Sequence, residues 1–477
     1  MNYKTLIGIE IHSELLTKTK AFCGCKNEFG SEVNTNCCPV CTGMPGTLPV
    51  LNKEVMRYAV MAGLATNCSI ETDTKMDRKN YFYPDLTKGY QISQFDKPLC
   101  YEGYVEIEDE EGRPKKIRLI RIHMEEDTGK SIHDTSGDSL IDYNRAGVPL
   151  IEIVSYPDMN SPTEAYRYLE NLKEILLFTG VSDVKMEQGS LRCDVNINVV
   201  REDGVKSNIV ELKNLNSFKS AFRAMEYEEK RHKELLEKGE NTVKETRRWD
   251  EQNQLTIPMR SKENVQDYRY FPEADITDFK LTQEYIEEIR RQLPELPAER
   301  RKRFVQEYGI AKDDAEILNT NVDISRYYEE LVKMTKEPVL TTNFFLSEFL
   351  RRLKDSESEI GNEKFSMEQF AYLLRQLAEK KINNNIAKKI FRKMFEEGTD
   401  PEEYIKSEGL VQVQDEGLIA GIVAEVVNRN PQSIEDIKNG KDRAFGFLVG
   451  QVMKESKGKA NPQMVNELLK KEIEKHM

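Results

Sequence analysis

The feature that most limits the fold is a series of short segments in which apolar and polar residues alternate. These segments dominate the chain up to about residue 225. The segments are IGIEIHSEL, YVEIEDE, IRLIRIHMEED, PLIEIVS, LRCDVNINVV and SNIVELKNL. A period of two is typical of β-strands that bury one face and expose the other. Turn-rich stretches and a few helices, expected at residues 162–178 and 217–238, separate the strands. We therefore predict an α+β domain on an antiparallel sheet rather than a repeated βαβ unit.

The character of the sequence changes at RRQLPELPAERRKRF, where two prolines interrupt a charged stretch. Beyond it nearly every segment has helical periodicity, as in TTNFFLSEFLRRL and SMEQFAYLLRQLAEKKI. A chain of 477 residues has room for about three domains. We expect a first domain at residues 1–292, an all-helical domain at 293–407 and a last helical unit at 408–477.

The net charge and the distribution of apolar residues limit the kinds of partner that this chain can bind. The net charge is −13, so the surface as a whole does not attract polyanions, and any contact with nucleic acid requires a local basic patch. The N-terminal segment lacks the continuous apolar run of a signal peptide, and no stretch approaches the roughly 20 apolar residues of a membrane helix. We expect a cytoplasmic protein without membrane contact.

Side chains that can bind metals and phosphates lie on the polar faces of the expected strands. Residues two apart in a strand share a face, which groups Glu10 with His12, His123 with Glu125, Arg192 with Asp194, Asn196 and Asn198, and Glu211 with Lys213. If these strands are neighbours, one sheet face can hold a divalent metal with phosphates. The alternative is an ordinary solvated face, which alternation by itself favours. Asp, Asn and Glu are poor strand formers, however, and this speaks for a functional face.

Three common catalytic motifs are absent from the sequence. DTGKS, at residues 127–131, resembles the end of a phosphate-binding P-loop, but Met124 stands where that motif needs glycine. No GxGxxG fingerprint follows a strand, so any ATP site must be of another kind. With five histidines and no serine- and glycine-rich nucleophile loop, glutaminase chemistry is not expected in this chain.

A cysteine cluster lies near the N-terminus, in AFCGCKNEFGSEVNTNCCPVCTGMPG. In a reducing cytosol such spacing favours a metal site over disulfides. Cys23, Cys25, Cys38 and Cys41 are the expected ligands of a structural zinc, with Cys37 spare. Free buried thiols are the alternative.

Several long motifs, in order along nearly the whole chain, resemble the GatB/GatE family of amidotransferase subunits. They are IGIEIHSELLTKTKAFC, MDRKNYFYPDLTKGYQISQFDKPL, RIHMEEDTGKS, DYNRAGVPLIEIVS, GSLRCDVNINV, ELKNLNSF and DYRYFPEADI. GKDRAFGFLVGQVMKESKGKANP is similar to the tail that this family shares with YqeY-like proteins. One departure is Thr87, where the family pattern has proline.

The resemblance implies a catalytic first domain related in fold to glutamine synthetase, with ATP and Mg²⁺ on an antiparallel sheet. The implied reaction is ATP-dependent phosphorylation of the side-chain carboxylate of Glu-tRNA(Gln) or Asp-tRNA(Asn), followed by amidation. Ammonia would come from an amidase (glutaminase) A subunit, in a heterotrimer whose third member is a small C subunit. A noncatalytic tRNA-binding scaffold and a stand-alone ammonia ligase resembling glutamine synthetase are the competing interpretations.

The resemblance and the strand faces together give a set of expected site residues. The expected magnesium ligands are His12, Glu125 and Glu211, followed by Glu10 and Asp194. The cations expected to balance phosphate charge are Arg192, Lys213 and Arg145, for which surface ion pairs are the alternative. The residues expected along an ammonia path are Lys79, Lys88 and Glu126.

The C-terminal tail is locally basic although the chain as a whole is acidic. Residues 438–459 carry six cations and two acids, an excess that suits a modest phosphate footprint. Phe445, Leu448 and Val452 follow helical spacing and should face a small core. The residues expected to contact tRNA are Lys441, Arg443, Lys454, Lys457 and Lys459. A solvated helical face is the alternative.

Overall fold

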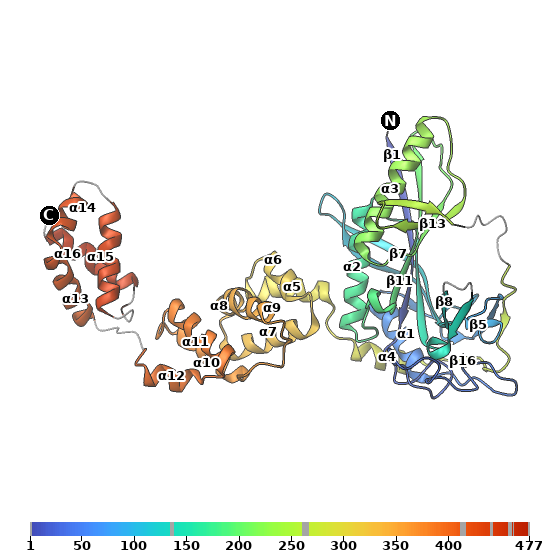
Figure 1. Cartoon of the computed structure of the whole chain (residues 1–477), viewed down its shortest axis with the longest axis horizontal. Helices are drawn as coiled ribbons and strands as arrows, with labels where there is room; N and C mark the ends of the chain where they lie inside the picture. The colour runs from blue at the N-terminus through green and yellow to red at the C-terminus, as the bar shows by residue number, and fades with distance from the viewer. Residues whose placement is uncertain are drawn as a thin grey trace. The chain divides into compact units, whose positions relative to one another are not determined.

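The computed structural model describes residues 2–133, 138–259, 267–410, 416–438, 442–456, 460 and 462–475. Its contacts divide the chain into two compact units, residues 1–297 and 298–477 (Figure 1). None of the helices within the described ranges has both the length and the apolar character needed to cross a bilayer.

A nine-stranded sheet forms the centre of the first unit. Its strands are, in spatial order, β14 (Leu255–Pro258), β13 (Glu245–Asp250), β12 (Val210–Lys213), β11 (Leu191–Arg201), β1 (Tyr3–Glu14), β10 (Pro149–Ser155), β7 (Pro114–Glu126), β6 (Cys100–Glu108) and β2 (Ser69–Ile70). The expected antiparallel sheet is confirmed, with one difference, because β12 and β13 are parallel. A parallel pair needs a crossover connection, and helix α3 (Phe218–Glu237) supplies it.

Small sheets lie beside the large one. They are β15 (Phe271–Pro272) with β4 (Asp77–Asn80) and β5 (Tyr90–Ser93), β3 (Asp73–Thr74) with β16 (Phe279–Lys280), and β8 (Lys130–His133) with β9 (Ser139–Asp142). The DTGKS segment therefore leads into strand β8 and not into the helix that a P-loop requires.

Helices cover the apolar face of the large sheet. The expected helices are confirmed as α2 (Pro162–Phe178), which packs on β6, and α3, which packs on β11. Ser161 and Ser217 cap these helices by accepting hydrogen bonds from backbone N–H groups of the first turn. Helix α1 (Lys53–Ala65) packs against β6, β7 and α4 (Gln283–Gln292). Alternate residues of β1, from Ile7 to Ile11, enter this core, so the residues between them face the other side.

The second unit is helical and contains two separate apolar cores. Around the first lie α5 (Pro297–Tyr308), α6 (Lys312–Leu318), α7 (Val322–Thr335), α8 (Pro338–Phe344), the π-helix η3 (Phe345–Leu350), α9 (Arg351–Asp355), α10 (Met367–Ala378), α11 (Asn384–Glu397) and α12 (Pro401–Ser407). Around the second lie α13 (Glu416–Arg429), α14 (Pro431–Lys438), α15 (Asp442–Glu455) and α16 (Pro462–Lys475). Separate cores support the predicted boundary near residue 408, and the three-domain division stays a prediction.

Candidate functional site

The register of the central strands gathers the polar residues on one face of the sheet. Across β7, β10, β1 and β11, cross-strand partners place His123, Glu152, His12 and Arg192 in one row. Glu10 and Asp194 are partners in the next row. The sheet thus brings together side chains that are distant in sequence.

A largely buried group of two carboxylates and two imidazoles, of which His12 is partly exposed, is the centre of this face. His12 Nε2 lies 3.2 Å from Glu125 Oε1 and 3.6 Å from Glu152 Oε2. His123 Nε2 lies 3.1 Å from the same Glu152 oxygen. Glu125, His123 and Glu152 are all less than a tenth exposed. We call these four residues the carboxylate–histidine cluster.

The charges in this cluster depend strongly on one another. Burial alone would lower the pKa of His12, but the carboxylates of Glu125 and Glu152 raise it to about 10. In return, although burial opposes ionisation, His12 and His123 lower the pKa of Glu125 to about 2. The carboxylates therefore attract positive charge, and a divalent cation would compete for the place that a proton takes on His12.

The donor set of the cluster fits a divalent metal. One donor atom each from His12, Glu125 and Glu152 lies within 4.8 Å of the others. Glu125 Oε2 is buried and, among the residues that the structure describes, has no hydrogen-bond partner. Carboxylates suit Mg²⁺, and the imidazole suits Mn²⁺ better than Mg²⁺. His12 and Glu125 were expected from the sequence as ligands, whereas Glu152 was not.

The other three expected magnesium ligands are Glu10, Asp194 and Glu211, and they form a second group around Lys213. The Lys213 ammonium pairs with Asp194 and lies 3.3 Å from Glu211 Oε1. Asn196 donates a hydrogen bond to Glu10 Oε1 at 3.1 Å. Burial raises the pKa of Glu10, and the carboxylates of Glu152, Asp194 and Glu211 raise it further. Glu10 thus lies in the electrostatic field of both groups, and a role for this second group in metal binding stays a prediction.

Two of the expected phosphate-balancing cations meet at one carboxylate. Arg192 Nη2 lies 2.6 Å from Asp127 Oδ2, and Arg145 Nε lies 3.4 Å from the same oxygen. Arg145 also donates hydrogen bonds to the carbonyl oxygens of Thr128 and Gly129. Within the described part of the chain, the Nε donor of Arg192 is buried without a hydrogen-bond partner. The Nε donor of Arg192 is therefore unused by the described residues, and a role of Arg192 and Arg145 in balancing phosphate charge stays a prediction.

The three expected ammonia-path residues occupy two places. Lys88 Nζ and Glu126 Oε1 form an ion pair of 2.7 Å, and both residues line a cavity of about 180 Å³ beside the cysteine loop. Lys79 does not line this cavity and lies 5.0 Å above the ring of Tyr268. Burial opposes its charge, but Glu125 helps to raise its pKa, which associates Lys79 with the carboxylate–histidine cluster.

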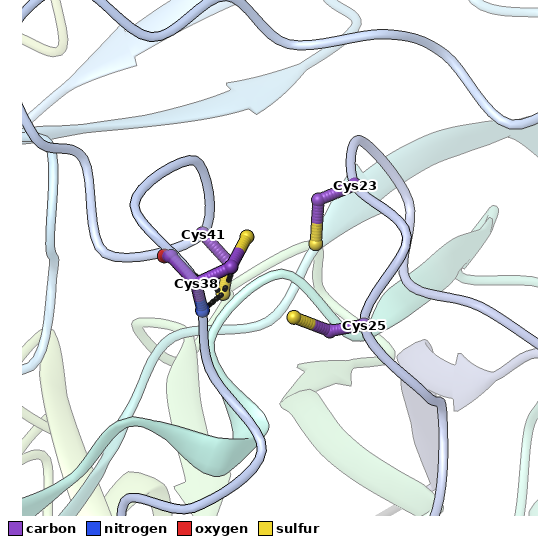
Figure 2. Close-up of side chains that lie close together, drawn as sticks. All are labelled: Cys23, Cys25, Cys38 and Cys41. Carbon is purple, nitrogen blue, oxygen red and sulfur yellow. Dashed lines mark hydrogen bonds between the residues drawn. The ribbon is translucent and has the colours of Figure 1, made fainter.

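The four expected zinc ligands converge from two loops (Figure 2). Their sulfur atoms all lie within 4.8 Å of one another, and those of Cys38 and Cys41 are 3.9 Å apart. Zinc–sulfur bonds of about 2.3 Å in a tetrahedron place sulfur atoms about 3.8 Å apart, so the arrangement fits zinc. Protein thiolates would fill all four positions, which is typical of a structural site.

The structure describes only part of the basic stretch at residues 438–459. The expected apolar face of α15 is confirmed, because Leu448 and Val452 are fully buried and Phe445 packs against the same core. Arg443 and Lys454 are exposed on this helix. The remaining expected tRNA contacts, Lys441, Lys457 and Lys459, lie outside the described residues.

Comparison with known proteins identifies the family. Residues 5–287 match the model of the GatB/GatE catalytic domain, and residues 326–473 match a second model, described as the GatB domain. The chain is 57% identical to the aspartyl/glutamyl-tRNA(Asn/Gln) amidotransferase B subunit of Finegoldia magna, over 99% of this chain and 100% of the relative. It is 53% identical to the protein of the same name from Caldicellulosiruptor saccharolyticus, over the full length of both. The chain therefore belongs to the GatB/GatE family.

Proposed function

We propose that this chain is the ATP-using B subunit of a tRNA-dependent amidotransferase. It phosphorylates the side-chain carboxylate of Glu-tRNA(Gln) or Asp-tRNA(Asn), and ammonia then converts the activated group into an amide. The observation that carries the proposal is the carboxylate–histidine cluster, with Arg192 and Lys213 on the same sheet face. The full-length similarity to proteins named as amidotransferase subunits supports it.

The chemistry explains why such a face is needed. A carboxylate does not react with ammonia because its leaving group would be oxide, whereas phosphate is a good leaving group. Phosphoryl transfer from ATP depends mainly on positioning and on neutralising phosphate charge. His12, Glu125 and Glu152 would hold a divalent ion that neutralises this charge. Arg192 and Lys213 add fixed positive charge from the neighbouring strands, and Arg192 has a donor to spare.

The surface around the cysteine loop supports delivery of ammonia by a partner. Large apolar side chains are exposed there, namely Phe29, Val33, Met44, Leu48 and Val50. Exposed apolar patches mark protein interfaces. We infer that the amidase (glutaminase) A subunit, together with the small C subunit, docks beside the cavity lined by Lys88 and Glu126. Ammonia would enter at this cavity and move towards the carboxylate–histidine cluster. Lys79, whose pKa Glu125 helps to raise, would lie near the end of that path.

The deciding experiment measures ADP formation by the purified complex with and without misacylated tRNA. We expect ADP to form only when Glu-tRNA(Gln) or Asp-tRNA(Asn) is present, because the aminoacyl carboxylate is the phosphoryl acceptor. Correctly charged Gln-tRNA(Gln) is the matched control, since it lacks that carboxylate. Unchanged ADP formation and amidation by a complex that carries Glu125→Gln in this chain would favour the alternative, a noncatalytic tRNA-binding scaffold.

Deleting the chain from residue 409 should weaken tRNA binding and raise the KM for tRNA without changing the chemical step. Residues 438–459 within the deleted segment carry an excess of cations, and each phosphate contact contributes about 0.7–0.9 to the slope of log affinity against log salt. We would measure tRNA affinity of the full-length and truncated complexes across a salt series.

Point variants separate charge from folding in this test. Arg443→Ala with Lys454→Ala removes two exposed cations of α15, and Lys470→Ala with Lys471→Ala removes two exposed cations of α16 outside the basic stretch. Only the first pair should flatten the salt dependence. An unchanged affinity and slope after deletion would mean that the basic tail is a solvated surface.

Protein purified without chelator should contain about one zinc per chain, because four thiolates at this spacing bind zinc tightly. Elemental analysis of the full chain measures this directly. If the purified protein contains no zinc, and zinc does not change its melting temperature, the four cysteines are free thiols.

A further inference from the structure

A fully buried lysine lies beside the cysteine site. Lys20 follows β1, three residues before Cys23, and has no exposed surface. Lysines are almost never fully buried unless their charge is compensated, because transfer of an ammonium from water to the protein interior is costly. Lys20 therefore requires a source of negative charge in its surroundings.

The contacts of Lys20 show where that charge lies. Within the described part of the chain, its Nζ donates a hydrogen bond to the carbonyl oxygen of Asn36 at 2.9 Å and lies 3.7 Å from Cys41 Sγ. A carbonyl is neutral, so it satisfies a hydrogen bond but does not balance the charge. The sulfur of Cys41 is thus the contacting atom that can carry a compensating charge.

Cys41 differs from the other three cysteines of the site in its burial, and its sulfur also accepts a backbone hydrogen bond. The backbone N–H of Cys38 donates to its sulfur at 3.1 Å. It is buried, whereas Cys23, Cys25 and Cys38 are partly exposed. Gly147 permits the close packing, since a side chain there would meet the Cys41 Cβ at 3.3 Å and the Lys20 stem at 3.7 Å.

We propose that Lys20 is a positioning residue that balances the charge of a zinc–tetrathiolate site formed by Cys23, Cys25, Cys38 and Cys41. The inference rests on the zinc proposed above. Zinc with four thiolates has a net charge of about −2, and one adjacent ammonium reduces it to about −1. The low local dielectric makes this attraction stronger than it would be at the surface. Lys20 thereby stabilises the zinc-loaded state more than the zinc-free state.

The zinc site also borders the cavity that Lys88 and Glu126 line, so the charge of Lys20 affects that cavity as well. The Cys41 carbonyl accepts a hydrogen bond from Thr87 Oγ1 at 3.0 Å, next to Lys88. Cys41 and Gly43 form part of the wall of the cavity that Lys88 and Glu126 line. Zinc held with the help of Lys20 therefore fixes one wall of that cavity.

Substitutions at Lys20 test the proposal on the full-length chain. Lys20→Met keeps the length of the side chain and removes its charge, Lys20→Arg keeps the charge, and Lys18→Met removes an exposed lysine two residues away as a control. Zinc affinity is measured by competition with a chromophoric chelator under reducing conditions. We expect Lys20→Met to weaken zinc binding by about 10- to 100-fold, as for other residues that support metal ligands. Lys20→Arg should retain most of the affinity and Lys18→Met all of it.

Melting temperatures with and without zinc separate a role at the metal from a general packing role. Lys20→Met should lower the melting temperature of the zinc-loaded protein and should not lower that of the zinc-free protein. Equal shifts in both states, or an unchanged zinc affinity, would overturn the role of Lys20. Absence of zinc binding by the unsubstituted chain would instead refute the zinc site itself.

Discussion

Glu125→Gln and His12→Ala should each lower ATP-dependent amidation by about a thousandfold. Glutamine keeps the shape of Glu125 but removes the charge that attracts a divalent ion, and alanine removes the imidazole that contacts both cluster carboxylates. A bound metal supplies several kcal/mol of charge stabilisation in such reactions, and each 1.36 kcal/mol is a factor of ten in rate. Single-turnover formation of ADP and of amidated tRNA by the reconstituted complex measures the loss.

Controls distinguish lost chemistry from lost structure. Complex assembly and the glutaminase activity of the partner should be largely unchanged in both variants. Glu152→Gln should behave like Glu125→Gln, since both carboxylates contact His12. Glu106→Gln changes an exposed glutamate of β6 and should have no effect. Near-normal amidation in the Glu125 and His12 variants would exclude this cluster as the metal site.

Glu228→Ala should lower the free energy of unfolding of the first unit by about 3–5 kcal/mol, the usual result of removing one partner from a buried ion pair. Glu228 is fully buried on α3, and Arg231, His232 and Thr256 all hydrogen-bond to it. Its removal leaves the buried Arg247, 3.1 Å away, without this counter-charge. Urea unfolding followed by fluorescence of Trp249, the one tryptophan of the chain, measures the loss within this unit.

The same carboxylate should make the first unit sensitive to acid. Burial opposes its ionisation, but its hydrogen-bond partners lower the pKa of Glu228 from 4.5 to about 2. A group with a depressed folded-state pKa stabilises the protein above pH 4.5, and this stability is lost as the pH falls towards 2. The loss corresponds to about 3 kcal/mol. Glu228→Gln should flatten this part of the pH dependence, whereas Glu234→Gln, an exposed control on α3, should leave it unchanged.

Periodicity sufficed to predict which face of each strand would carry His12 and Glu125, because alternation fixes the direction of every side chain. It did not reveal Glu152, although this residue is the one charged side chain in the apolar run PLIEIVS. Its position follows from strand order, since β10 lies between β1 and β7 and brings Glu152 between the two histidines. Strand order depends on contacts distant in sequence, which a single sequence does not display.

Lys20 illustrates a second limit of prediction from sequence. In LLTKTKAFC, two lysines alternate with threonines, a pattern that is typical of a solvated strand end. Lys18 is indeed exposed, but Lys20 is fully buried. Its burial results from the loop that carries Asn36 and Cys41, which closes over it. The sequence around Lys20 therefore did not indicate that its side chain is buried.

The central position of β1 in the sheet has a consequence for synthesis on the ribosome. Strand β1 pairs with β10 and β11, which end at Ser155 and Arg201. At about 5–20 residues per second, a nascent chain needs roughly 10–40 s after making β1 to complete β11. Until β10 is complete at Ser155, the apolar residues of β1 lack both native neighbours, and until β11 is complete they lack one. A nascent chain that stalls before residue 149 also lacks the strand that carries Glu152, so the carboxylate–histidine cluster cannot assemble until well after its first residue, His12, has been translated.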